Sequence, residues 1–278
     1  MSSWDLVTFT RLHVASMILL SAHRYVSPVA MRPILGDLVV QSARPAPNHL
    51  RWLHKFTAPR VLLRRCAQFL LSEREQDGTL AGYHSSTFLF LCATKALGLV
   101  PPDFQQAISA IRERVADWFE DGKSLQQTCD AHVWNTALTL RTLRAGGLSL
   151  DHPTVTAGAQ YLVHRQHKAQ WNDYQKAFLP GGAWGFSQNN TRHPDTDDTA
   201  ACLEALWGCD ALQEADRQAA IAWLLARQNK DGGWSAFDTN CNKRWLEKMP
   251  ANDMRHAIAD PSTPDITGRV TELLVSKA

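Results

Sequence analysis

Residues 223–234 read WLLARQNKDGGW, and this stretch decides the fold. It starts as the apolar end of a helix, reaches a glutamine at position 228 and turns through two glycines into Trp234. A glutamine at a helix end can satisfy carbonyls that its own helix leaves unpaired and reach the amides that begin the next helix. Tryptophan offers a flat face on which that side chain can lie. The stretch therefore predicts a unit that ties neighbouring helices together.

The same unit recurs twice along the chain. Residues 161–166 read YLVHRQ and, after an insertion, residues 181–184 read GGAW. An eroded copy at residues 69–80 reads FLLSEREQDGTL. One copy would be weak evidence, because any helix can end in Gly-Gly-Trp. Three copies favour a repeat architecture in which helix pairs stack into a solenoid or ring.

Helical periodicity dominates the rest of the sequence. Apolar spacing predicts helices at residues 61–73, 87–99, 104–119, 131–143, 155–166, 199–206, 217–227 and 265–275. The apolar run at 14–20 is too short to span a bilayer and is interpreted as a buried helix rather than a signal peptide. Residues 44–48 contain two prolines and predict a linker. Strand signals are weak throughout, so the predicted fold class is all-α.

Composition narrows the class of protein. The chain has 278 residues, of which 45% are hydrophobic and 20% charged, so a packed core is possible. A formal net charge of +2 is too balanced to suggest a partner that is a nucleic acid. None of the six cysteines forms a CxxC pair, which favours reduced thiols and a cytoplasmic location.

The acidic cluster Asp195, Asp197 and Asp198 has two interpretations. Locally, Asp195 follows Pro194 as a helix N-cap, and the other two lie in the first turn, where the helix dipole favours negative charge. Alternatively, three carboxylates in four residues cannot all ionise cheaply in a dry pocket, so at least one keeps its proton. Such an acid can protonate an alkene, and the resulting cation needs aromatic faces and no water. Both interpretations remain open on the residues alone.

Longer motifs carry a family resemblance. The stretch GGAWGFS at 181–187, followed by DTDDT at 195–199, resembles the signature of class II triterpene cyclases of the squalene–hopene cyclase type, and the repeats resemble their QW motifs. Further resembling segments are VWNTAL at 133–138, DGGWSAFD at 231–238, DPSTPDITGR at 260–269 and residues 3–13. The resemblance thus runs over nearly the whole chain. The stretches WGFS at 184–187 and DITGR at 265–269 are closer to the sporulenol synthase (tetraprenyl-curcumene cyclase) branch than to hopene synthases.

The resemblance implies roles for four acids. Asp197 would be the proton donor, Asp195 and Asp198 would tune it through hydrogen bonds and charge, and Asp265 would support the acid site. Arg269 stands where hopene synthases have a histidine. An arginine in contact with Asp197 would favour its ionised form, although the side chain could instead point away from the acid.

The resemblance also implies aromatic residues that face the substrate. Trp134, Phe186 and Phe237 fall where family members place such rings, and packing in the core is an equally good explanation for each of them. Asn135 departs from the family pattern, which has an aspartate at that position.

The family further implies architecture and partners. We expect a partial (α/α)6 barrel, with residues 1–50 forming the end of an inserted second barrel plus linker, and residues 51–278 an incomplete catalytic barrel. The substrate would be a linear polyprenoid, squalene or tetraprenyl-curcumene, used without a cofactor or metal at the inner face of the membrane by a peripheral protein. A missing C-terminal half or a homo-oligomer would complete the barrel.

Three alternatives remain. The chain could be an inactive fragment or the partner subunit of a split cyclase. A protein prenyltransferase β-like subunit would need zinc, for which Asp198 and Cys202 lie four apart on one helix face but lack a convincing third ligand. A class I terpene synthase would need Asp-Asp-x-x-Asp rather than the Asp-x-Asp-Asp found here.

Overall fold

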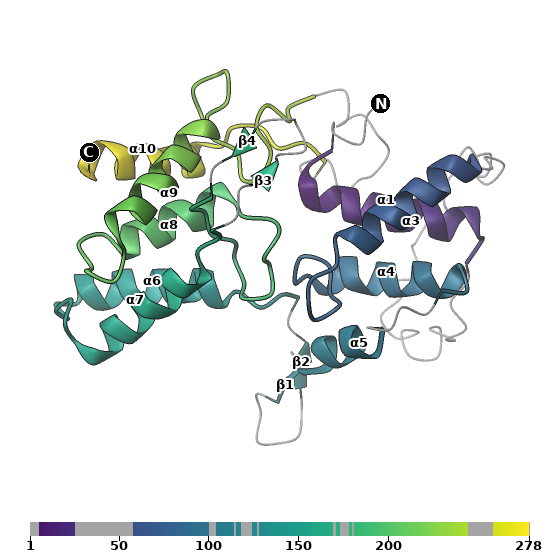
Figure 1. Ribbon diagram of the computed structural model, residues 1–278, viewed down its shortest axis with the longest axis horizontal. Helices are drawn as coiled ribbons and strands as arrows, with labels where there is room; N and C mark the ends of the chain where they lie inside the picture. Colours follow the sequence, from purple (N-terminus) through teal and green to yellow (C-terminus); the bar gives the residue numbers. More distant parts are fainter. Residues whose placement is uncertain are drawn as a thin grey trace, which may run out of the picture.

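The computed structural model describes residues 6–25, 58–99, 104–113, 115–117, 124–126, 128–168, 171–172, 178–179, 181–243 and 258–277. Helices form two groups, here called the N-terminal lobe and the C-terminal lobe (Figure 1). The N-terminal lobe holds α1 (Thr8–Ala22), α3 (Arg60–Ser72), α4 (His84–Ala96) and α5 (Phe104–Glu113). The C-terminal lobe holds α6 (His132–Ala145), α7 (Pro153–Arg165), α8 (Thr196–Ala205), α9 (Glu214–Ala226) and α10 (Pro264–Lys277). The predicted all-α class is confirmed.

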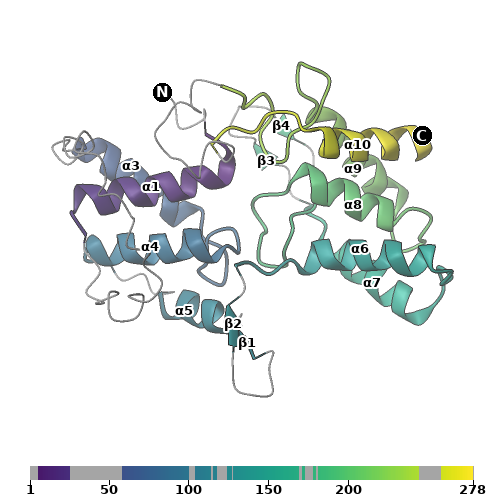
Figure 2. The ribbon, with the colours of Figure 1, turned by 180° about the vertical axis from the view of Figure 1, so that it is seen from behind.

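The N-terminal lobe is built around α1 and α4. Helix α1 packs against both α3 and α4 (Figure 2). Their contact buries Leu12, Leu70, Leu80 and Phe90, each no more than 2% exposed. The interpretation of the apolar run at 14–20 as part of a buried helix is confirmed, because Leu19 is only 1% exposed.

The C-terminal lobe is a two-layered arc. Helix α8 lies between α6 and α10, while α7 backs α6 and α9 backs α8. The centre of its core is formed by Trp184, Trp223, Leu203 and Leu206, all fully buried. Replacing a buried tryptophan of this kind by alanine costs about 3–5 kcal/mol. An inner row of helices with an outer row behind it is the arrangement expected of a partial (α/α)6 barrel.

Some sequence expectations need correction. The helix predicted to run to residue 119 ends at Glu113, and Val115–Asp117 forms strand β1, which pairs antiparallel with β2 (Ser124–Gln126). A second short pair joins β3 (Trp171–Asn172) to β4 (Phe178–Leu179). The predicted linker at 44–48 lies outside the described residues. The proposed division at residue 50 stays a prediction.

The three repeat copies share one backbone motif. The residue after the glycine turn donates its backbone N–H to a threonine hydroxyl of the next helix. The three pairs, each 3.0 Å apart, are Trp184 with Thr199, Trp234 with Thr267, and Leu80 with Thr87. The eroded copy is thus built like the other two, which confirms that it is a repeat.

The glutamine of the repeat does not act as predicted. The indole N–H groups of Trp184 and Trp234 bond the carbonyls of Leu162 and Leu224, both at 2.7 Å, so tryptophan satisfies the helix end. Gln166 instead donates to the carbonyl of Gly182 at 2.8 Å and that of Asp216 in α9 at 3.1 Å. Its amide group reaches carbonyls rather than amides, because the tryptophan already occupies the end of the helix.

One glycine of the repeat is required by close packing. Gly182 has φ +118°, and a Cβ there would lie 2.7 Å from the backbone of Ala219 in α9. Only glycine permits both this conformation and this approach. The turn is thereby pressed against the outer helix of the next pair.

A buried ion pair joins the two lobes. Arg11 of α1 lies 3.0 Å from the carboxylate of Asp238, and both side chains are 2% exposed. Asp238 also accepts hydrogen bonds from the backbone N–H and the hydroxyl of Thr8. Removing one partner of such a pair costs about 3–5 kcal/mol, so the lobes are firmly connected. Across the described ranges, no helix has the length and apolar character needed to cross a bilayer.

Candidate active site

The acid motif begins helix α8. Asp195 is its N-cap, and its Oδ1 accepts the backbone N–H of Asp198 at 2.8 Å. The backbone N–H of Asp195 bonds the carbonyl of Trp184 at 3.0 Å, and Thr199 Oγ1 returns to the Asp195 carbonyl at 2.6 Å. The predicted N-cap role of Asp195 is therefore confirmed. It leaves the other carboxyl oxygens to be explained.

Asp195 and Asp198 form a buried carboxyl pair, at 3% and 5% exposure. Among the described residues, Asp195 Oδ2 and Asp198 Oδ1 have no donor when both groups are ionised. Burial raises the pKa of Asp195 well above its usual value, and the Asp198 charge and hydrogen bond raise it further. Burial also raises the pKa of Asp198, to about 7. One proton shared between the two carboxyls would supply the missing hydrogen bond.

Asp197 is the accessible acid of the three. Its side chain is 31% exposed, and its Oδ1 lies 2.7 Å from Nε of Arg269 in α10. The possibility that Arg269 points away from the acid was wrong. The pKa of Asp197 is nevertheless raised, because burial outweighs Arg269, which lowers it, and the charge of Asp265 adds to the rise.

Asp265 lies in the first turn of α10, one helical turn before Arg269. It is exposed, and a hydrogen bond from the Thr263 side chain lowers its pKa. The Arg269 guanidinium lies over the ring of Trp134, 5.1 Å from the centroid. Trp134, Arg269, Asp197 and Asp265 thus form one cluster across the amino-terminal ends of α6, α8 and α10.

The aromatic residues form a row between the lobes. Phe237 lies 6.1 Å from Phe9, Phe9 stacks on Tyr83 at 5.4 Å, and Tyr83 meets the edge of Phe186 at 4.8 Å. The pKa of Tyr83 is raised to about 12, first by burial and then by the charges of Cys129, Asp195 and Asp198. This row therefore passes beside the carboxyl pair.

Backbone contacts tie the row to the acid motif. The N–H of Trp134 donates to the carbonyl of Phe186 at 3.3 Å, and the N–H of Thr196 donates to the carbonyl of Ala236 at 2.8 Å. The three predicted aromatic residues are consequently all brought to the acid. Phe9 and Tyr83 were missed by sequence reasoning. The available signals were that Tyr83 lies three residues after the eroded repeat and that Phe9 lies in the resembling segment at 3–13.

Asp260 was also missed. Its carboxylate accepts three consecutive backbone N–H groups, those of Ala236, Phe237 and Asp238, at 3.1, 2.6 and 2.7 Å. Burial raises its pKa to about 6, although these bonds favour the ionised form. Asp260 therefore fixes the turn that carries Phe237.

Comparisons with known proteins identify the family of the chain. The family model of the squalene-hopene cyclase C-terminal domain matches residues 131–278. The chain belongs to the squalene–hopene cyclase family. The matched region contains α6 to α10 with the acid motif, Arg269 and Trp134.

Three curated relatives are similar to this cyclase-family chain. The sporulenol synthase of Bacillus subtilis is 35% identical over 236 residues, or 82% of this chain and 37% of the relative. A terpene cyclase–glycosyl transferase fusion protein of Humicola fuscoatra is 37% identical, covering 79% of this chain and 17% of its own length. A squalene hopane cyclase of Aspergillus fumigatus is 30% identical over 98% of this chain and 42% of its own length. The chain therefore spans less than half of each relative.

The interpretation of Asp198 and Cys202 as zinc ligands gains no support from the structure. Asp198 and Cys202 are both buried on α8, but the described residues contain no group of three or more histidine, cysteine or acidic side chains that could hold a metal. The pKa of Cys202 is raised by burial and by the two nearby carboxyls, which opposes the thiolate that zinc requires.

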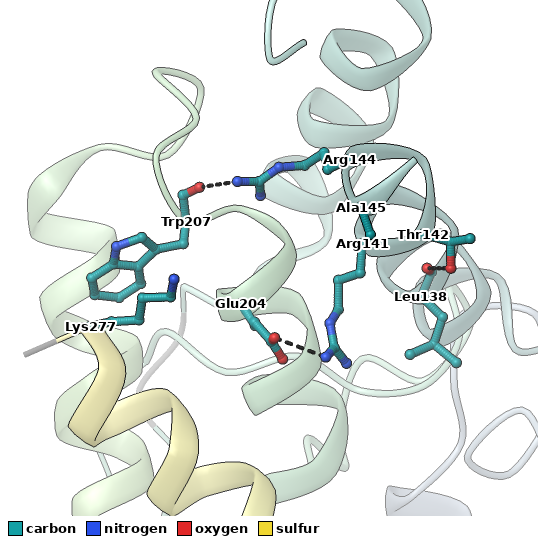
Figure 3. Close-up of a pocket in the computed structure, with 8 residues that line it drawn as sticks. All are labelled: Leu138, Arg141, Thr142, Arg144, Ala145, Glu204, Trp207 and Lys277. Carbon is teal, nitrogen blue, oxygen red and sulfur yellow. Dashed lines mark hydrogen bonds and ion pairs between the residues drawn. The ribbon is translucent and has the colours of Figure 1, made fainter. Parts of the chain in front are cut away.

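A separate cavity of about 570 Å³ lies at the other ends of the same helices (Figure 3). Its lining includes Trp207, Lys277 and the ion pair of Arg141 with Glu204 at 2.8 Å. Arg144 donates to the carbonyls of Ala205 and Trp207. The lining of this cavity includes none of Asp195, Asp197, Asp198 and Asp265. We therefore place the candidate active site at the amino-terminal ends of the inner helices.

Proposed function

We propose that the chain carries the acid site of a protonation-initiated triterpene or sesquarterpene cyclase. The observation that carries the proposal is a partly exposed carboxyl, Asp197, beside a buried carboxyl pair and a row of aromatic rings. Asp197 is the donor in this proposal, since Asp195 and Asp198 are too buried to meet a substrate.

In the proposed reaction, the O–H bond of Asp197 breaks and the proton adds to the terminal double bond of a linear polyprenoid. The carboxylate that remains pairs with Arg269, 2.7 Å away. Asp195 and Asp198 hold negative charge and a shared proton behind it, which opposes early ionisation of Asp197. Asp265 acts in the same direction, because its charge raises the pKa of Asp197.

The cation then passes along the polyene as rings close, and the cascade ends in loss of a proton or capture of water. Aromatic faces stabilise a cation by about 0.5–2 kcal/mol each. Trp134, Phe186 and Phe237, with Phe9 and Tyr83, are the proposed rings. Squalene and tetraprenyl-curcumene are the proposed substrates.

The surrounding organisation is proposed on family grounds. Residues 1–50 would belong to the end of an inserted barrel and residues 51–278 to the catalytic barrel. The protein would bind the inner face of the membrane peripherally, where its apolar substrate dissolves.

The test is to incubate the protein with vesicles containing squalene or tetraprenyl-curcumene and to analyse the extracts for cyclic products. Asp197→Asn is expected to reduce product at least about 100-fold. Asp210→Asn, at an exposed position in the turn after α8, is the matched control and should leave product unchanged. Equal product from wild type and Asp197→Asn would refute Asp197 as the donor.

A second candidate is a catalytically inactive fragment or a partner subunit of a split cyclase. It is favoured by the position of Arg269 Nε, 2.7 Å from Asp197, because this contact favours the ionised carboxyl over the protonated donor. Sedimentation separates the two functions: a discrete complex that forms product supports the cyclase, whereas a lone chain that gives no product supports the second candidate.

A further inference from the structure

The segment that leads into the acid motif is held from the other lobe. In the connection between α3 and α4, the Glu75 carboxylate accepts the backbone N–H of Thr191 at 3.1 Å and its hydroxyl at 2.5 Å. Glu73 Oε2 lies 3.3 Å from Nε2 of His193. Figures 1 and 2 show this connection beside the loop before α8. Both glutamates are 5% exposed and His193 is 6% exposed, so the contacts are largely removed from water.

The held segment is itself a closed turn. Asn190 donates from Nδ2 to the carbonyl of His193 at 2.9 Å and accepts the His193 N–H at 3.0 Å. Asn190 is 1% exposed. Only Pro194 separates this turn from Asp195, so a displacement of the turn is transmitted to the buried carboxyl pair.

The repeat shows that the fold alone does not require a glutamate at position 75. The equivalent residue in another copy is Asn229, since Glu75 N–H bonds Thr79 as Asn229 N–H bonds Gly233, at 2.9 and 2.8 Å. Asn229 uses its neutral side chain within its own lobe and accepts the N–H of Asn240. A buried carboxylate costs far more than an amide. What distinguishes Glu75 from Asn229 is its contact with Thr191 across the lobes.

We propose that Glu73 and Glu75 are positioning residues that fix residues 191–193 and thereby keep the Asp195–Asp198 pair dry. This role rests on the proposed cyclase function and deepens it. The physical claim is that the two glutamates keep water away from the Asp195–Asp198 pair. The other groups that face the pair are Asp197, Arg269, Tyr83 and Cys202. None of them contacts Glu75 in the described hydrogen bonds, so they are unchanged in the variants below.

The experiment titrates the protonated carboxyl band of the pair by infrared difference spectroscopy. Each protein is compared with its own Asp195→Asn counterpart, so that only the pair contributes. Glu75→Gln and Thr191→Val should lower the midpoint by about one pH unit or more, because water that enters favours the ionised form. Thr191→Ser should restore the midpoint. Glu214→Gln, exposed in the first turn of α9, is the control and should not move it.

A lower melting temperature with an unchanged midpoint would overturn the proposal, since the glutamates would then serve stability alone. Failure of both Glu75→Gln and Thr191→Val to fold would overturn it as well. The titration needs no substrate. A wild type that forms no cyclic product would therefore refute the cyclase function while leaving a shifted midpoint intact, and an unshifted midpoint with normal product would refute only the positioning role.

Discussion

Helices α8 and α10 begin in the same way but carry different chemistry. In each, the backbone N–H of a tryptophan after the glycine turn bonds the hydroxyl of a threonine one turn into the helix. The carbonyl of the same tryptophan accepts the backbone N–H of the helix N-cap, Asp195 in α8 and Thr263 in α10. At the third helical position, however, α8 has the buried Asp198, whereas α10 has the buried Ile266. The same framework therefore accepts an apolar side chain where the acid stands.

The two helix starts separate the capping interpretation from the chemical one. Asp265, in the first turn of α10, is exposed, and its pKa is lowered by a hydrogen bond from the Thr263 side chain and then by the backbone N–H of Ile266. Asp198, in the first turn of α8, has a pKa raised to about 7 by burial. Since both residues lie in a first helical turn, the burial of Asp198 outweighs the effect of the helix dipole there. N-capping explains the hydrogen bond of Asp195 Oδ1. It does not explain why Asp195 and Asp198 are buried together.

The largest expected effect is on the pH dependence of stability. The folded state binds the Asp198 proton more tightly than the unfolded chain, with a pKa of about 7 against 3.8. Ionising it in the fold costs about 4 kcal/mol, so this contribution is fully present below pH 4 and is lost as the pH rises through 7. Urea unfolding of wild type and Asp198→Asn across pH 4–8 should diverge accordingly. Asp265→Asn should keep the wild-type slope; a wild-type slope in Asp198→Asn would contradict the comparison.

The reciprocal exchange is the next largest. Ile266→Asp places an acid at the equivalent buried position of α10, without a partner carboxyl at the helix start, where Thr263 stands. We expect a loss of about 3 kcal/mol at pH 8 from lost apolar burial and desolvation. Guanidinium unfolding measures it. A neutral effect would mean that α10 tolerates an acid as well as α8 does.

The shared threonines should differ by their burial. Thr199 is fully buried and Thr267 is partly exposed. Thr199→Val should cost about 2 kcal/mol of stability and Thr267→Val about 1 kcal/mol. The reason is that water can reach the backbone N–H of Trp234 but not that of Trp184. Thermal unfolding of the two variants side by side tests this order, and a reversed order would contradict it.

The smallest effect concerns the repeat glutamines. The Gln166 side chain donates two hydrogen bonds to carbonyls, and the residue is 5% exposed. Gln228 is exposed, and among the described contacts its side chain bonds only the carbonyl of Gly232. Gln166→Ala should cost about 1 kcal/mol and Gln228→Ala less than about 0.5 kcal/mol. Urea midpoints give both values, and equal costs would remove the distinction between the two junctions.

Much of the fold could be predicted because the repeat is local. Glycine turns, helical periodicity and N-caps are written in adjacent residues, and the helices begin and end within a few residues of the predicted places, except after Glu113. The role of the glutamine could not be predicted, since tryptophan and glutamine compete for the same carbonyls. Only the structure shows that the indole N–H wins at Leu162.

The acid motif was predictable because its three carboxyls are adjacent in sequence. The residues that surround it from the other lobe were not. Phe9, Tyr83 and Glu75 lie more than 100 residues before α8, and each has an ordinary packing or surface interpretation when read alone. The direction of Arg269 depends likewise on how α10 packs against α8, which periodicity does not give.

The central claim is that the Asp195–Asp198 pair keeps a proton at neutral pH. Infrared difference spectra of wild type against Asp195→Asn, recorded at pH 6 and followed upward, test it most directly. We expect a protonated carboxyl band at pH 6 that disappears on titration near or above pH 7. Absence of that band at pH 6 would show that both carboxyls are ionised and would contradict the account.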